Sequence, residues 1–116
     1  MASSKGVNLD NTHAMEAQEA LSLIKDYFIR ELSYLERIKE YNDPAGYWGI
    51  EYGNKNVSVL LESGRGFLDW SIEIDNNKVA LENYDQAIKN VKASSKNNIE
   101  FILGIIKQVV VQGSPH

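Results

Sequence analysis

The chain has 116 residues, of which 43% are hydrophobic, and it carries a formal net charge of −4 with no cysteine. This length fits one domain with a core of its own. The lack of cysteine excludes disulfides, thiolate nucleophiles and cysteine-based metal sites. Seven acidic and three basic residues lie between positions 43 and 82, so this central part alone carries −4. Such a surface repels nucleic acid and attracts a basic partner.

The ends of the chain are polar. We predict a flexible leader over residues 1–14, a single domain over residues 15–112 and a short tail over residues 113–116. The leader contains no apolar signal segment, and no apolar run reaches the roughly 18 residues of a membrane span. The expected location is therefore the cytoplasm, without membrane association.

A period of three to four residues dominates the stretch from Ala14 to Tyr41. Its apolar positions, which would form one face of an amphipathic helix, are Leu21, Ile24, Phe28, Leu32, Leu35 and Ile38. Asn11 or Thr12 is expected to cap this helix. Pro44 is expected to end it, because proline disfavours the α conformation in the residue before it. The pattern predicts one long N-terminal helix.

The period changes to two after Gly46. Four segments alternate apolar and polar residues and are separated by glycine or asparagine turns; they are residues 47–52, 57–62, 66–75 and 78–82. Strands joined by such short turns are antiparallel neighbours. Trp48 and Trp70 fall on the apolar face of their strands, so both are expected in the core.

A helical period returns after Asn83, with Gln86 as a capping-box partner. Ser94 and Ser95 interrupt it, so residues 84–111 form either one helix or two. The last stretch is strongly apolar, which fits deep burial or a dimer interface. The predicted fold class is α+β: an N-terminal helix, a four-stranded antiparallel meander, and one or two C-terminal helices packed on one face of the sheet.

The sequence offers no catalytic set. The two histidines are His13, in the leader, and His116, the last residue. Neither position suits a Ser-His-Asp triad or a histidine-based metal site. The glycine-rich SGRG segment lacks a P-loop lysine and joins two strands. We therefore expect no enzyme, no metal and no cofactor.

Alternation along the strands places acidic residues together on the sheet face opposite the tryptophans. This face has three interpretations: a solvated surface, a recognition surface for a basic partner, or a carboxylate pair for acid–base chemistry. Arg65, at the tip of a turn, either aids solubility or lies at the edge of a contact surface. The predicted partner-binding residues are Tyr47, Glu51, Glu62, Arg65, Phe67, Asp69 and Glu73.

Residues 20–92 resemble the small immunity proteins of bacterial polymorphic toxin systems. The resemblance lies in a leading helix, Trp48 before Tyr52-Gly53, the strand Val57-Ser58-Val59, a glycine-containing turn and the segment WSIEID at residues 70–75. It implies a cytoplasmic inhibitor that binds a cognate toxin, often a basic nuclease. It assigns no binding residue. The alternative is a small structural domain that forms a homodimer through its apolar C-terminal helix.

Overall fold

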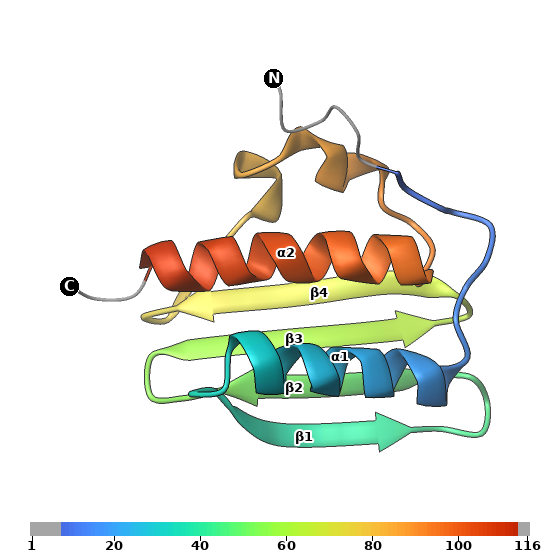
Figure 1. Ribbon diagram of the computed structural model, residues 1–116, viewed down its shortest axis with the longest axis horizontal. Coiled ribbons are helices and arrows are strands. Elements are labelled where there is room, and N and C mark those ends of the chain that lie inside the picture. The colour runs from blue at the N-terminus through green and yellow to red at the C-terminus, as the bar shows by residue number, and fades with distance from the viewer. Residues whose placement is uncertain (1–7, 114–116) are drawn as a thin grey trace.

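The computed structural model describes residues 8–113. Five strands form one antiparallel sheet in chain order, β1-β2-β3-β4-β5. Helices α1 and α2 lie on the same side of this sheet, α1 over β2 and α2 along β4 (Figure 1). The elements are α1 (Ala17–Glu31), β1 (Glu36–Asn42), β2 (Trp48–Gly53), β3 (Val57–Gly64), β4 (Phe67–Ile74), β5 (Asn77–Lys78), the 3-10 helices η2 (Leu81–Asn83) and η3 (Gln86–Asn90), and α2 (Lys96–Gly113). The α+β class is confirmed.

The predicted N-terminal helix is wrong beyond Glu31. The backbone leaves the helical region at Leu32 (φ −138°, ψ 48°), and residues 36–42 form the edge strand β1. Leu32 and Leu35 are apolar because both enter the core, at 0% and 4% exposure, and their spacing happens to match that of a helix. Ile38 fitted the same spacing, yet it is exposed. The sheet therefore has five strands, one more than predicted.

The predicted helix boundaries at Thr12 and Pro44 are also different. Glu16 occupies the N-cap position of α1, and no side chain caps the helix. Pro44 lies in the turn between β1 and β2, where Asp43 Oδ1 accepts a hydrogen bond from the backbone N–H of Ala45 at 2.7 Å. Gly46 completes this turn with a φ of 97°. These turn-forming residues end a strand instead of a helix.

The C-terminal part contains a single α-helix. The predicted strand 78–82 is reduced to β5, and residues 81–83 and 86–90 form the 3-10 helices η2 and η3. The segment that follows runs along β4, where Phe67 and Ala93 form an isolated bridge. Ser95 then caps α2, because its Oγ accepts a hydrogen bond from the N–H of Asn98 at 3.2 Å.

The core lies between the sheet and the two helices. Trp48 is 2% exposed, which confirms its predicted burial, whereas Trp70 is only partly buried. The Phe28 ring of α1 stacks on Tyr52 of β2, with centroids 3.9 Å apart and planes at 3°. The apolar stripe of α2 is completely buried; its members are Ile99, Ile102, Leu103, Ile106 and Val109. Each buried Leu or Ile stabilises the fold by about 1.5–3 kcal/mol.

Residues 8–14, within the range predicted as a leader, run beside the start of α2. Asn98 is fully buried, and its Nδ2 donates to the backbone oxygens of Asp10 and Ala93, both at 2.9 Å. Its Oδ1 accepts from the N–H of Asp10 at 2.9 Å, and Asn11 Oδ1 accepts from Asn98 Nδ2 at 2.8 Å. These bonds fasten the N-terminal segment to the helix. Residues 1–7 of the predicted leader and 114–116 of the predicted tail lie outside the described residues.

Candidate protein-binding face

The helices leave one side of the sheet uncovered, and we call this side the outer face (Figure 1). Residues paired across antiparallel strands point to the same side, so the strand register defines its members. Besides Gly49, Gly53 and Gly64, they are Glu36, Ile38, Lys39, Tyr41, Tyr47, Glu51, Ser58, Leu60, Glu62, Phe67, Asp69, Ser71, Glu73 and Lys78. All the sequence-predicted binding residues except Arg65 are among them.

Two carboxylates of the outer face lie directly opposite each other. Glu62 of β3 pairs with Asp69 of β4 in the register. Tyr41 donates a hydrogen bond from its hydroxyl to Glu62 Oε2 at 2.8 Å. Among residues 8–113, no lysine or arginine forms an ion pair with either carboxylate. Like charges opposite each other destabilise a strand pair, so this arrangement has a cost in stability.

Of the other three carboxylates of this face, Glu36 lies opposite Gly53, and two have basic neighbours. Glu51 lies opposite Lys39 of β1, and Glu73 lies opposite Lys78 of β5. Glu51 also accepts a hydrogen bond from Ser58 Oγ at 3.0 Å. Glu62 and Asp69 are therefore the two carboxylates of the outer face that lie opposite each other instead of opposite a lysine.

Two aromatic rings of the outer face, those of Tyr41 and Tyr47, lie over glycines. A Cβ added to Gly49 would come within 2.7 Å of Tyr41 Cζ, and one added to Gly64 would come within 2.8 Å of Tyr47 Cε2. Neither glycine has a positive φ, so the backbone conformation does not require glycine at either position. Instead, each makes room for a ring that lies against the sheet, an arrangement known to stabilise glycines in strands.

Phe67 completes the group as the register partner of Gly64, and its side chain is 63% exposed. Tyr47 is 40% exposed. We call the five residues Tyr41, Tyr47, Glu62, Phe67 and Asp69 the acidic–aromatic patch. Rings that are already held in place lose little conformational entropy when a partner binds.

Tyr41 is the member of the patch that sequence reasoning missed, because residues 36–41 were assigned to a helix. Tyr41 lies near the end of β1 and Tyr47 lies just after the turn at residues 43–46, which is the pattern of an aromatic pair flanking a hairpin. Burial, and secondarily the hydrogen bond to Glu62, raises the pKa of Tyr41 to about 12. Tyr41 is thus a neutral donor at physiological pH.

Arg65 lies in the two-residue turn between β3 and β4. Both Arg65 (φ 55°) and Gly66 (φ 83°) have positive φ values, as type I′ hairpin turns require. Arg65 is exposed and, within the part of the chain that the structure describes, forms no ion pair. It therefore stands at the end of the outer face and does not neutralise the patch.

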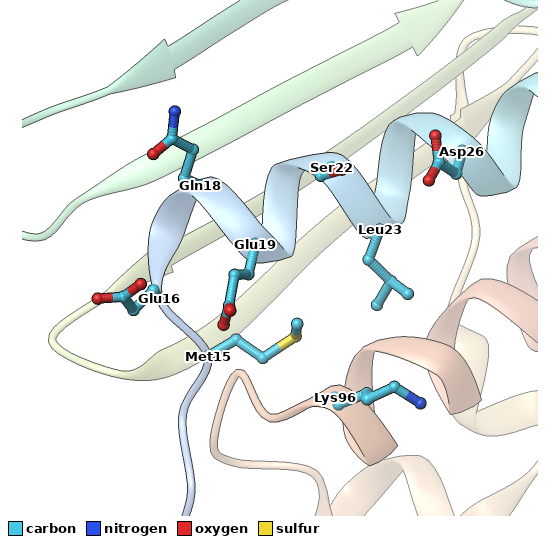
Figure 2. A pocket seen from close by; sticks show the side chains of 8 residues that line it. All are labelled: Met15, Glu16, Gln18, Glu19, Ser22, Leu23, Asp26 and Lys96. Atoms are coloured by element: carbon cyan, nitrogen blue, oxygen red, sulfur yellow. The ribbon is translucent and has the colours of Figure 1, made fainter.

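A second feature is an open groove of about 600 Å³ between the starts of α1 and α2. Its carboxylates, Glu16, Glu19 and Asp26, are spread along α1 and do not converge on one point (Figure 2). Lys96 on the opposite side pairs with Glu100 at 3.0 Å. This arrangement offers no close carboxylate pair for acid–base chemistry.

Other kinds of site have no support in the described residues. Over residues 8–113, no three or more His, Asp or Glu side chains are grouped so that they could hold a metal ion. Nor does any helix in that range have both the length and the apolar character needed to cross a membrane. Comparisons with protein-family models, curated proteins and solved structures find no match for this chain.

Proposed function

We propose that this chain is a non-enzymatic protein-binding domain that inhibits a basic partner through the outer face of its sheet. The observation that carries this proposal is the acidic–aromatic patch, where Glu62 and Asp69 face each other and neither forms an ion pair with a residue of the range 8–113. Exposed aromatic side chains are frequent anchors of protein interfaces. Complementary charge raises the association rate and selects the partner.

The resemblance to immunity proteins suggests the class of partner, a cognate bacterial toxin such as a basic nuclease. An acidic face fits this role because it presents carboxylates where a nuclease would otherwise bind phosphates. The inhibitor and the toxin would meet in the cytoplasm of the producing cell. The patch would contribute charge through Glu62 and Asp69 and contact area through its three rings.

The alternative, self-association through α2, gains no support from the side chains of that helix. The apolar stripe of α2 is already buried in the core of its own chain. Val111, at 54% exposure, is the large apolar side chain of α2 that is most exposed among the described residues. One such residue near a helix end is normal for a protein surface.

Growth rescue tests the proposal. The C-terminal part of the reading frame immediately upstream of this gene is induced in a host cell, and survivors are counted with and without this chain. We expect killing that is relieved only when this chain is present. A harmless neighbour, or killing that this chain does not relieve, would contradict the proposal.

Binding kinetics with the purified partner add a second test. The association rate is expected to fall steeply as ionic strength rises, because exposed charges are screened over about 8–10 Å at physiological salt. A rate that does not respond to salt would contradict a charge-guided interface.

A further inference from the structure

The spacing of Glu62 and Asp69 favours one kind of cation. They are direct cross-strand neighbours, so their Cβ atoms are about 4.5–5.5 Å apart. A guanidinium carries five N–H donors in a planar fork and can donate to two carboxylates at once. A lysine ammonium has a single charged nitrogen that keeps its water more strongly. The geometry thus suits arginine better than lysine.

The rings of the patch favour the same choice. Tyr41 and Tyr47 lie against the sheet over Gly49 and Gly64, beside the carboxylates, and Phe67 is largely exposed. A guanidinium plane stacks on aromatic rings, and this contact is stronger when water is excluded. The chain already contains one such contact elsewhere, because Arg30 Cζ lies 5.7 Å from the centroid of the Tyr27 ring.

The described part of the chain does not fill this position itself. Arg65 is near in sequence, yet it lies in the hairpin turn and forms no ion pair among residues 8–113. The repulsion between Glu62 and Asp69 therefore persists in the free protein. A cation from outside would relieve it, which adds to the affinity of the complex.

We propose that the acidic–aromatic patch is the binding site for one arginine side chain of the protein partner. The guanidinium donates to Glu62 and Asp69 and lies against the aromatic rings. This inference rests on the proposed function, and it adds the residue type that the partner must present. It also predicts that replacing this arginine by lysine in the partner weakens the complex.

A titration followed by NMR tests this inference with the full chain. The probes are N-acetyl-arginine amide and, at the same concentration, N-acetyl-lysine amide. We expect the arginine compound to shift resonances of the patch and to bind several times more tightly than the lysine compound. Glu62→Gln and Asp69→Asn should each remove most of the shift, because they keep the shape of the side chain and remove its charge. Glu100→Gln, an equal change in a carboxylate of α2 that pairs with Lys96, is the matched control and should leave the shift in place.

Three outcomes would overturn the inference. They are equal shifts with both probes, shifts centred on the groove residues Glu16 and Glu19 instead of the patch, and an unchanged response in both charge-removing variants. The proposed function fails separately. If growth rescue depends on Glu62 and Asp69 while the two probes act equally, the outer face binds a partner but does not select arginine. If the probes behave as expected and rescue fails, the arginine site stands and the toxin partner is wrong.

Discussion

Alternate residues of β3 show how differently the two faces of the sheet are built. Val57, Val59 and Leu61 point toward the helices and are at most 5% exposed. Their neighbours Ser58, Leu60 and Glu62 point to the outer face and are partly exposed. One face thus holds the apolar contacts that stabilise the fold. The other retains exposed rings and two opposed carboxylates, which cost stability. Such a cost is expected where a surface is used for binding.

The largest expected effect is a difference in stability between substitutions of two adjacent leucines, one on each face of the sheet. Leu61→Ala should lower the free energy of unfolding by about 2–5 kcal/mol, because it leaves a cavity beneath the helices. Leu60→Ala should cost less than about 1 kcal/mol, since its side chain is not enclosed. Denaturant unfolding measures both. Equal losses would show that the outer face is packed as tightly as the inner one.

The glycines under the rings allow a sharper test of the outer face. Gly64→Ala should displace the Tyr47 ring and weaken partner binding by about 1–3 kcal/mol, as much as Tyr47→Ala. The double variant should bind the partner as tightly as either single variant, because the two substitutions remove the same contact. Affinity is measured with the purified partner.

Gly104→Ala is the matched control for this substitution. A Cβ at Gly104, within α2, meets nothing within 4 Å. It should therefore leave binding unchanged and stabilise the helix by about 0.5–1 kcal/mol. Additive losses for Gly64→Ala and Tyr47→Ala would contradict the role assigned to the glycine.

A smaller effect concerns the charges. Glu62→Gln should raise the free energy of unfolding by about 0.2–1 kcal/mol, because it removes repulsion from Asp69 and keeps an acceptor for Tyr41. Glu73→Gln should have the opposite sign, since Glu73 faces Lys78. Both effects should shrink with added salt. A loss of stability in Glu62→Gln at low salt would mean that the fold needs this charge.

The smallest effect lies in the N-terminal segment, away from both faces. Hydrogen bonds from the backbone and side chain of Thr12 lower the pKa of Asp10 from 3.8 to about 2. Because the folded pKa is the lower one, this carboxylate stabilises the fold above pH 3.8 and loses the contribution as pH falls toward 2. Asp10→Asn should remove this part of the acid dependence in pH-dependent unfolding. If the stability of the variant falls with decreasing pH as that of the unsubstituted chain does, the bonds to Thr12 add no stability.

The sequence predicted the strands that have one buried side and one exposed side. Residues of β2, β3 and β4 alternate because one side meets the helices and the other meets solvent. Strand β1 was missed because all seven of its residues are exposed, so no alternation marks it. Leu32 and Leu35 reinforced the error, because they enter the core from a loop at helical spacing.

The segment before α2 was also not predictable from local pattern. Its conformation depends on partners distant in the sequence, such as Asn11, whose side chain bonds the backbone of Asn90 and Lys92. For the outer face, alternation was enough to group Tyr47, Glu62, Phe67 and Asp69. The register was needed to reveal which carboxylates face a lysine and which face each other.

The most direct test of the central claim compares two charge reversals in the growth-rescue assay. One variant carries Glu62→Lys and Asp69→Lys on the outer face. The other carries Glu16→Lys and Glu19→Lys beside the groove of Figure 2, so the change in net charge is identical. Circular dichroism checks that both are folded. We predict that the groove variant still relieves killing and that the outer-face variant does not. Full rescue by the outer-face variant, or loss of rescue in the groove variant alone, would contradict a role for the outer face in binding.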